Sequence, residues 1–265
     1  MPGVVSPGSC LARLMADTLL EIRGLAKSFG GLVATDHIDL EVAEGETLAI
    51  IGPNGAGKTT LIAQLAGEIR PDGGRIRFAA EDITPLPAPA RSQRGLARSF
   101  QITSIFRDFT TLDNVALAVQ AHAGHSFRFW HPARAERGLR AAAREALETV
   151  GLGPRADVLA STLAHGEQRQ LEIAMALATR PRLLLLDEPV AGMGPEESQR
   201  MIRFLGTLKG RVTLVLVEHD MDAVFALADR ICVLVYGRIL ASGPPASIRA
   251  NAAVRQAYLG EETDI

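Results

Sequence analysis

The hydrophobic residues of this chain recur with two different periods. Within "HIDLEV", residues 37–42, apolar and polar side chains alternate, and this period of two predicts a half-buried β-strand. Unbroken apolar runs follow at residues 47–51, 183–186 and 213–217. Runs of this length predict strands that are buried on both faces, as in a parallel sheet. The segment "RICVLVYGRILASG" predicts two more strands joined at Tyr236-Gly237.

A helical period occupies the segments between these strands. "KTTLIAQLAGEI", from Lys58, has apolar residues at helical spacing. Between residues 101 and 163 the pattern is also helical, and one apolar stripe there consists of Leu139, Ala143, Leu147 and Val150. A last helix is expected near the C-terminus, ending at Tyr258-Leu259. Strands that alternate with helices in this way predict an α/β fold.

Composition and charge narrow the possible classes of protein. The chain has 265 residues, of which 47% are hydrophobic, and its net charge is −2 from 28 basic and 30 acidic residues. This balance predicts no nucleic-acid partner. The two cysteines, Cys10 and Cys232, form no spacing pattern, so a reduced cytosolic protein is expected. No apolar run approaches the ~18–20 residues that a membrane helix needs, and residues 1–16 are expected to be a disordered extension.

The clearest chemical motif is "GPNGAGKTT", which lies between a predicted strand and a predicted helix. It matches G-x-x-x-x-G-K-[ST], a loop whose backbone N–H groups surround the phosphates of a nucleotide. Lys58 is expected to reach the β- and γ-phosphates, the Thr59 hydroxyl to ligate Mg²⁺, and Thr60 to contact the α-phosphate. The predicted phosphate-binding residues are Gly52, Pro53, Asn54, Gly55, Ala56, Gly57, Lys58, Thr59 and Thr60.

Three polar residues follow buried strands, where α/β sheets bind their ligands. Asp187 and Glu188 follow four leucines, and His219 follows the run "VTLVLV" closely. Asp187 is expected to hold Mg²⁺ through water, and Glu188 suits a general base that polarises the attacking water. His219 is placed to bond the γ-phosphate and orient that water. The alternatives are a solvated acidic strand end and a structural histidine.

In this order the motifs resemble the ATP-binding subunit of ABC transporters over residues 18–260. Phe29 in "LAKSFGG" matches the aromatic residue that stacks on adenine, and Gln101 in "ARSFQ" matches the Q-loop. The resemblance implies that Gln101 takes part in catalysis and in Mg²⁺ binding. It also makes Asp187 the Walker B aspartate, Glu188 the catalytic glutamate and His219 the switch histidine. ATP and Mg²⁺ are the implied ligands.

"LAHGEQ" matches the signature of the same family, which covers the ATP held by a second cassette in a head-to-tail dimer. The implied contact residues are Leu163, Ala164, His165, Gly166 and Glu167. The usual signature is Leu-Ser-Gly-Gly-Gln, so Ala164 cannot supply the serine hydroxyl. Backbone N–H groups and the helix dipole still favour a phosphate there. A second departure is Gly194, where the D-loop normally carries an aspartate.

These departures are similar to those in cassettes of the branched-chain amino acid uptake family, as are "SFGGLVATDHIDLEV", "ARSFQITSIFRDFTTLDNVALA" and "AYLGEE". The implied function is an ATP-hydrolysing subunit that energises uptake of branched-chain amino acids or related small solutes such as amides and urea. The implied partners are membrane permease subunits, a paralogous or identical second cassette and, indirectly, a periplasmic solute-binding protein. The implied location is the cytoplasmic face of the inner membrane, as a peripheral protein. A lipopolysaccharide-export cassette and a non-transport ABC ATPase are the alternatives. A P-loop kinase or GTPase would need neither a signature nor a switch histidine, so the presence of both motifs argues against these classes.

The resemblance implies one ABC ATPase domain at residues 17–260. Its α/β core, a mixed sheet with an antiparallel edge, is expected at 17–100 and 181–243, and its helical lobe at 101–180. A C-terminal helical segment at 244–260 and a tail at 261–265 complete the chain. In the family, the region after the Q-loop grips the membrane subunit, so Phe106, Arg107 and Phe109 are either a docking surface or core residues. The histidines of "AHAGHSFRFWHPAR" fit no zinc spacing, so this segment is expected to be a surface insertion.

Overall fold

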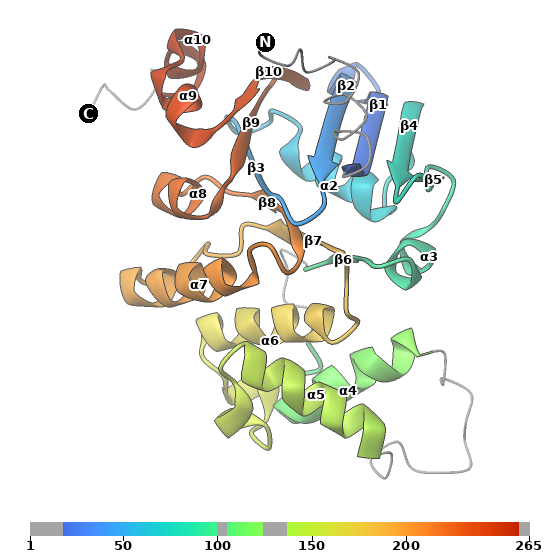
Figure 1. The fold of residues 1–265 in the computed structure, drawn as a ribbon, viewed down its shortest axis with the longest axis vertical. Helices are drawn as coiled ribbons and strands as arrows, with labels where there is room; N and C mark the ends of the chain where they lie inside the picture. The colour runs from blue at the N-terminus through green and yellow to red at the C-terminus, as the bar shows by residue number, and fades with distance from the viewer. Residues whose placement is uncertain (1–17, 100–104, 124–136, 260–265) are drawn as a thin grey trace, which may run out of the picture.

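Two β-sheets and a set of helices build the protein (Figure 1). The computed structural model describes residues 18–99, 105–123 and 137–259. The strands are β1 (Thr18–Phe29), β2 (Leu32–Ala43), β3 (Thr47–Ile51), β4 (Gly73–Phe78), β5 (Glu81–Asp82), β6 (Leu96–Arg98), β7 (Leu183–Asp187), β8 (Thr213–Val217), β9 (Arg230–Val235) and β10 (Arg238–Gly243). The α-helices are α2 (Lys58–Ala66), α3 (Ala88–Gln93), α4 (Thr111–His122), α5 (Arg137–Thr149), α6 (His165–Leu177), α7 (Pro195–Leu208), α8 (Met221–Leu227), α9 (Pro245–Ala250) and α10 (Ala252–Val254). Short helical turns lie at η2 (Gly153–Arg155), η3 (Ala160–Thr162) and η4 (Arg255–Leu259).

The larger sheet has six strands in the order β10-β9-β3-β8-β7-β6. Its strands pair in parallel except for β10, which is antiparallel to β9 at one edge. All residues of β3, β7 and β8 are buried, so the unbroken apolar runs correctly predicted strands covered on both faces. The α/β fold with a mixed sheet and an antiparallel edge is therefore confirmed. Tyr236 and Gly237, which join β9 to β10, both have positive φ, as a tight two-residue hairpin requires.

The smaller sheet is antiparallel, with four strands in the order β2-β1-β4-β5. The alternating segment 37–42 lies in the second half of β2, with Ile38, Leu40 and Val42 buried as predicted. The strand itself begins earlier, at Leu32, because its first residues pair with the end of β1, including Phe29 with Leu32. Strand β2 also contacts β10 of the larger sheet.

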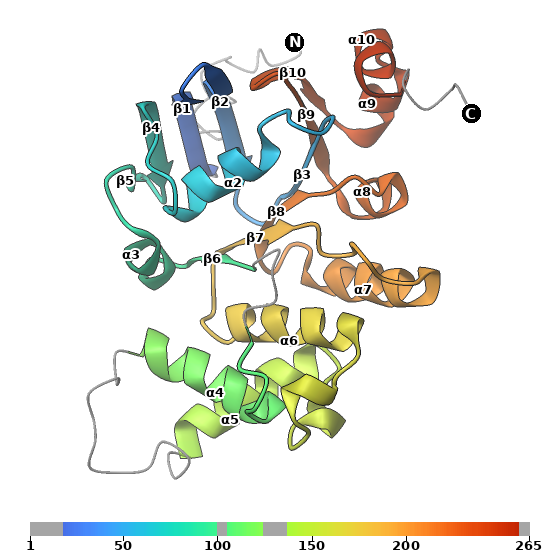
Figure 2. The same cartoon turned by 180° about the vertical axis from the view of Figure 1, so that it is seen from behind.

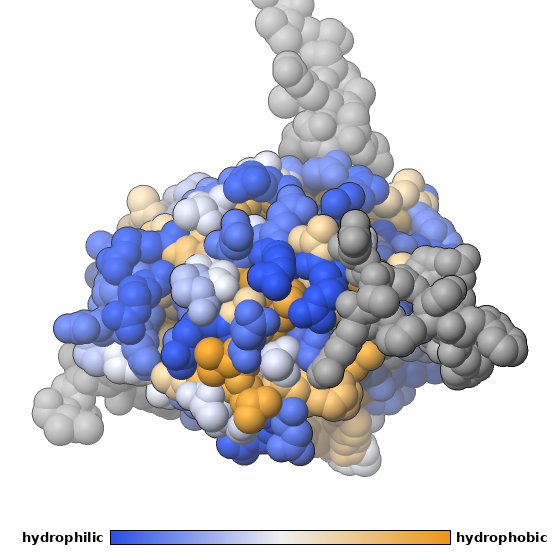
Figure 3. Space-filling model, turned by 90° about the horizontal axis from the view of Figure 1, so that it is seen from below, coloured by the Kyte–Doolittle hydropathy of each residue, from blue (hydrophilic) through white to orange (hydrophobic). Residues whose placement is uncertain are grey.

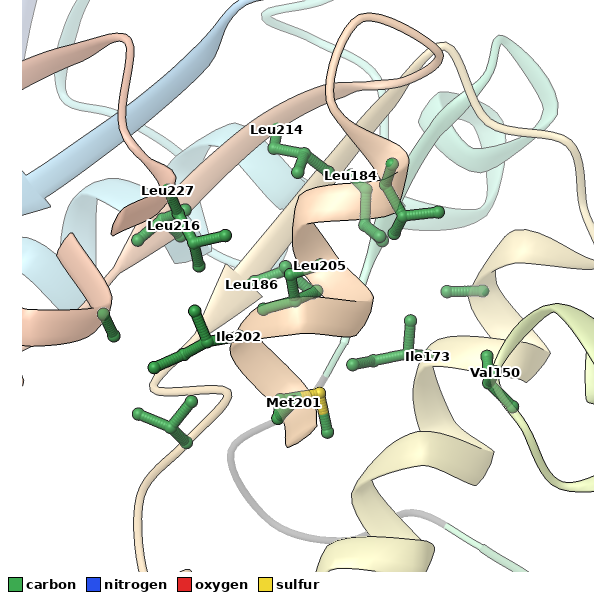
Figure 4. Packing of buried hydrophobic residues seen from close by; sticks show 14 of the residues in the cluster. Val150, Ile173, Leu184, Leu186, Met201, Ile202, Leu205, Leu214, Leu216 and Leu227 are labelled. Atoms are coloured by element: carbon green, nitrogen blue, oxygen red, sulfur yellow. The ribbon is translucent and has the colours of Figure 1, made fainter. Parts of the chain in front are cut away.

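Alternate residues of the parallel strands divide the interior into two cores. Leu48, Leu183 and Val215 face one core, which also contains the buried residues of α2 and the antiparallel sheet. Their neighbours Ala49, Leu184 and Leu216 face the other core, which contains residues of α4 to α8. Figure 4 shows part of this second core, in which Met201, Ile202 and Leu205 of α7 belong to the same cluster as leucines of β7 and β8. Helices α2 and α6 therefore lie on opposite faces of the larger sheet (Figure 2).

Helices α4, α5 and α6 pack together as a helical lobe below strands β6 and β7 in Figure 1. The predicted stripe of α5 and the residues after it is buried: Leu139, Ala143, Leu147 and Val150. Seen from the end of the molecule that carries this lobe, a hydrophobic patch lies among hydrophilic residues (Figure 3). Among the described residues, no helix is long and apolar enough to cross a membrane. The N-terminal extension, the 261–265 tail and most of the histidine-bearing segment lie outside the described residues.

Candidate active site

The predicted phosphate loop connects β3 to α2, in the order strand, loop and helix. Its lysine is folded back onto the loop, because the Lys58 Nζ donates to the carbonyl oxygens of Gly52 at 2.6 Å and Pro53 at 3.0 Å. The β9–β10 turn also bonds to the loop, because the Gly237 N–H donates to the Ala56 carbonyl at 3.0 Å. The same turn accepts a bond from β2, from the Asp36 N–H to the Gly237 carbonyl. Segments of both sheets thus hold the loop.

Two glycines of this loop have a backbone that a side chain would disrupt. Gly52 has φ 154° and Gly57 has φ 100°, and both values favour glycine. A Cβ on Gly52 would lie 2.0 Å from the Leu234 carbonyl oxygen, and one on Gly57 would lie 2.0 Å from that of Ala34. The loop therefore needs glycine at these positions for two reasons, its backbone angles and its close approach to β9 and β2.

Asp187, the last residue of β7, is almost fully buried, and its two carboxylate oxygens have different surroundings. Its Oδ2 lies 3.0 Å from the Arg98 Nη2 on the neighbouring strand β6. Its Oδ1 is buried and has no hydrogen-bond partner among the described residues. Burial raises the pKa of Asp187, and the positive charge of Arg98 opposes that shift.

Glu188 and His219 lie together at the ends of β7 and β8. The Nδ1 of His219 is 3.6 Å from the Oε1 of Glu188, and the His219 side chain is exposed. Glu188 has a positive φ of 49°, which is uncommon for a residue with a Cβ, and its N–H donates to the Val217 carbonyl. This bond continues the pairing of β7 with β8 past the end of the strand, and backbone strain of this kind is concentrated at functional sites.

A second buried carboxylate, Glu218, was not singled out by the sequence analysis. It is fully buried and accepts the Val190 N–H at 3.0 Å and the His219 N–H at 3.1 Å. Burial raises the pKa of Glu218, and these backbone bonds oppose the shift. Glu218 therefore connects the segment after Glu188 to the segment that carries His219. The only signal in the sequence is a charged residue that directly follows a buried strand.

Electrostatics join the phosphate loop to these strand ends. Burial lowers the pKa of Lys58, and the negative charges of Glu188 and Asp187 oppose that shift. The loop lysine and the two carboxylates are thus close enough to interact. The structure brings together at one edge of the sheet the groups that the sequence places more than a hundred residues apart.

The fit of Mg²⁺ can be judged from the polar groups at this edge. Asp187 has a buried oxygen available, and Thr59 is exposed in the first turn of α2. No group of three or more histidine, cysteine, aspartate or glutamate side chains capable of holding a metal occurs in the described residues. Mg²⁺ is usually bound by one or two protein oxygens together with substrate phosphates, so Asp187 and Thr59 fit it. Gln101, the third predicted Mg²⁺ residue, lies outside the described residues.

Phe29 lies at the end of β1, and its ring is about half exposed. The Lys27 Nζ lies 5.4 Å from the centre of the ring and also pairs with the Asp72 carboxylate. The strand that pairs with Phe29 contributes the Ala34 carbonyl beside Gly57. Phe29 is therefore accessible and is connected through β2 to the phosphate loop.

The predicted signature is the first turn of α6 and the residues before it. Leu163 is buried, Ala164 is the N-cap, and His165 and Gly166 already belong to the helix. The N–H groups of a helix's first turn have no partner within the helix, so they can receive an anion. The Glu167 carboxylate accepts the Ala164 N–H at 2.9 Å and pairs with Arg155. Helices α2 and α6 themselves pack on opposite faces of the larger sheet.

Comparison with known proteins identifies the family. The model of the ABC transporter family matches residues 35–191, more than half of the chain. The chain belongs to the ABC transporter family. A second model, described as the branched-chain amino acid ATP-binding cassette transporter, matches residues 238–264 of this ABC cassette. As a member of the family, the chain is an ATPase of the transport type.

Curated relatives resemble the ABC cassette over nearly its whole length. It is 42% identical to the high-affinity branched-chain amino acid transport ATP-binding protein BraF of Pseudomonas aeruginosa, over 93% of this chain and 100% of that protein. It is 39% identical to the protein LivG of Escherichia coli, which has the same description and is covered to the same extent. Among solved structures, the ADP conformation of MJ1267, an ATP-binding cassette of an ABC transporter, matches with a TM-score of 0.81 and 29% identity. That match covers 92% of this chain and 99% of MJ1267.

Proposed function

We propose that this chain binds and hydrolyses ATP with Mg²⁺ to energise an importer of branched-chain amino acids or related small solutes such as amides and urea. One observation carries the catalytic part of the proposal. Lys58, Asp187 and Glu188 interact at one sheet edge, and His219 lies 3.6 Å from Glu188. A phosphate-binding lysine beside a general base and a histidine suits the hydrolysis of a nucleoside triphosphate.

The proposed roles follow from the position of each group. The loop amides and Lys58 bind the phosphates, and Phe29 stacks on the base. Mg²⁺, when bound at Asp187 and Thr59, would neutralise charge that develops on the phosphates. Glu188 accepts a proton from the attacking water, and His219 orients Glu188 and the γ-phosphate. Gln101, which follows β6 in the sequence, is proposed to join this site.

A second cassette is proposed to complete the site. Helices α2 and α6 lie on opposite faces of the larger sheet, and the first-turn N–H groups of α6 have no partner within the helix. A head-to-tail dimer would place that helix N-terminus over the partner's nucleotide. Leu163, Ala164, His165 and Gly166 would form the contact, while Glu167 stabilises the turn through the Ala164 N–H. The partner is proposed to be a paralogue, with an identical chain as the alternative.

The membrane partner is proposed to dock on the helical lobe. ATP-binding proteins of transport systems act with membrane permease subunits. Phe106 and Phe109 are 51% and 43% exposed, and their rings stack with centroids 5.3 Å apart. Together with the exposed Arg107 they form an accessible aromatic pair beside a cation, which suits a protein contact. Docking there would place the chain at the cytoplasmic face of the membrane, with a periplasmic solute-binding protein as an indirect partner.

We also propose the domain division stated for the sequence, with the α/β core at 17–100 and 181–243 and the helical lobe at 101–180. The C-terminal helical segment is placed at 244–260. An extension at 1–16 precedes the domain, and a tail at 261–265 follows this segment. ATP binding would favour the closed dimer over the open one, and hydrolysis would release it.

The test is a Glu188→Gln variant of the full chain. We expect hydrolysis to fall at least about 100-fold while ATP binding persists, because a general base contributes about 10²–10⁴ in rate. A matched control is Glu196→Gln, which changes a highly exposed carboxylate on α7 and should hydrolyse ATP like the wild type. Retained hydrolysis in the Glu188 variant would contradict the proposed base.

Light scattering after size-exclusion chromatography then tests the dimer in the same variant. Dimerisation with ATP alone would support an identical partner, and dimerisation only with a paralogous cassette would support a mixed one. A monomer in both cases, with ATP demonstrably bound, would contradict the isolated-cassette dimer.

A further inference from the structure

The two oxygens of Asp187 are in unequal environments, and Arg98 is the cause. One oxygen, Oδ2, is paired with the Arg98 guanidinium at 3.0 Å. The other, Oδ1, is buried without a hydrogen-bond partner among the described residues. A carboxylate attached by one oxygen cannot rotate freely about its last bond, so its second oxygen keeps one direction.

Arg98 is itself held at several points. Its backbone pairs with Leu185 of β7, and the next residue, Ser99, donates its N–H to the Leu185 carbonyl at 2.9 Å. The second terminal nitrogen of the guanidinium, Nη1, pairs with Glu68 just after α2. The Arg98 side chain is only 9% exposed, whereas Glu68 is 33% exposed. The planar guanidinium therefore spans from Glu68 near the surface to the buried Asp187.

We propose that Arg98 is a positioning residue that orients Asp187 for Mg²⁺, with Glu68 holding the guanidinium in place. The inference rests on the proposed function, because it concerns the Mg²⁺ that accompanies ATP. Arg98 does not touch nucleotide in this role. It acts through Asp187, in the way that outer partners of metal ligands commonly fix ligand orientation.

A purely electrostatic role for Arg98 predicts the opposite result. A fixed positive charge 3.0 Å from the carboxylate repels a divalent cation, so removing that charge alone should strengthen Mg²⁺ binding. Loss of orientation should weaken it. The sign of the change in Mg²⁺ affinity therefore distinguishes positioning from charge compensation.

The experiment is calorimetric titration of the full chain with ATP, first in EDTA and then over a series of free Mg²⁺ concentrations. For Arg98→Gln we expect an unchanged ATP affinity in EDTA. The Mg²⁺ requirement is the free Mg²⁺ concentration at which half of the Mg²⁺-dependent increase in ATP affinity is reached. We expect this concentration to rise about tenfold. Arg98→Lys keeps the charge but loses the planar fork, so it should show a similar or slightly smaller rise. Glu68→Gln should show a rise of about threefold, because the ion pair between Glu68 and Arg98 weakens.

Arg94→Gln is the matched control. Arg94 also pairs with a carboxylate, that of Glu81, but at the surface, and the variant should match the wild type throughout. A double-mutant cycle supplies a readout that a structural role would not change: in an Asp187→Asn background, Arg98→Gln should cause no further rise.

An unchanged or lowered Mg²⁺ requirement in a folded Arg98→Gln variant would overturn the inference. If that variant does not fold, Glu68→Gln decides, and an unchanged Mg²⁺ requirement there overturns it. Failure of the wild type to bind ATP with or without Mg²⁺ would instead contradict the proposed function.

Discussion

The Val190 N–H donates to the Glu218 carboxylate at 3.0 Å, and this bond joins two segments that flank the site. Val190 follows Glu188, and Glu218 precedes His219, whose own N–H donates to the same carboxylate at 3.1 Å. The carboxylate therefore holds the segments of the proposed general base, Glu188, and of His219 in one relative position. Because it is fully buried, it does so at a cost in desolvation.

That cost predicts how stability depends on pH. Burial raises the pKa of Glu218 above its ordinary value of 4.5 in the folded protein, so the folded state binds this proton more tightly than the unfolded state. The contribution of Glu218 to stability is then full below pH 4.5 and is lost as the pH rises through the folded pKa. We expect the unfolding free energy of the wild type, relative to Glu218→Gln, to decrease as the pH rises above about 4.5. Urea denaturation of both proteins at each pH measures this relative unfolding free energy. If the wild type became more stable relative to Glu218→Gln as the pH rises, the assigned cause would be contradicted.

The phosphate loop offers a comparison between two glycines. Gly57 and Gly55 both have positive φ, but a Cβ on Gly55 meets nothing within 4 Å. We expect Gly55→Ala to lower the unfolding free energy by about 1 kcal/mol through backbone strain alone. Gly57→Ala should cost about 2–4 kcal/mol, because its Cβ would also collide with the Ala34 carbonyl. Chemical denaturation checks the order, which equal losses would contradict, and Gly57→Ala should also weaken ATP binding.

The exposed pair Phe106 and Phe109 separates docking from folding. We expect Phe106→Ser and Phe109→Ser each to change the unfolding free energy by less than about 1.5 kcal/mol, since stacking of two exposed rings contributes little more than that. ATP hydrolysis by the isolated chain should not change, whereas co-purification with the membrane subunits should decrease. Leu240→Ser, at an exposed leucine of β10, is the control and should leave co-purification intact. Normal co-purification of both phenylalanine variants would favour another docking surface.

A buried arginine is expected to stabilise the end of α2. Arg91 is almost fully buried and donates to the carbonyl oxygens of Gln64 at 2.8 Å, Leu65 at 2.7 Å, Thr84 at 3.1 Å and Leu86 at 2.9 Å. Burial lowers its pKa to about 10, so it stays charged at neutral pH. Arg91→Met should lower the unfolding free energy by at least about 3 kcal/mol, because it removes the hydrogen bonds that the guanidinium donates to these carbonyls. Thermal unfolding compares it with Arg94→Met at the surface, and equal effects would contradict the role.

Local patterns explain what could be predicted from the sequence. β3, β7 and β8 are covered on both faces, so each one is a continuous apolar run that is visible without its neighbours. The phosphate loop is a contiguous motif whose residues are close in space because they are close in the chain. The stripe of α5 repeats at helical spacing for the same reason. The start of β2 was missed, because Leu32 and Val33 are exposed there and only pairing with β1 makes them a strand.

Long-range pairings escaped the sequence because they depend on strand order. Arg98 meets Asp187 only because β6 lies beside β7, and Glu218 meets Val190 only because β8 lies beside β7. The choice between core packing and exposure for Phe106 and Phe109 was also undecided, because the same apolar residues suit either role. The roles predicted for the site residues stay predictions.

By itself, then, the sequence determined the fold class, the buried strands and the chemistry available, since these follow from local patterns of polarity and from contiguous motifs. Only the tertiary structure decided which charges meet. It attached one oxygen of Asp187 to Arg98, joined Glu218 to Val190, and put α2 and α6 on opposite faces of the sheet. The physical reason is that an ion pair or a hydrogen bond acts over a few ångströms, and the folded path of the chain alone sets which residues come that close.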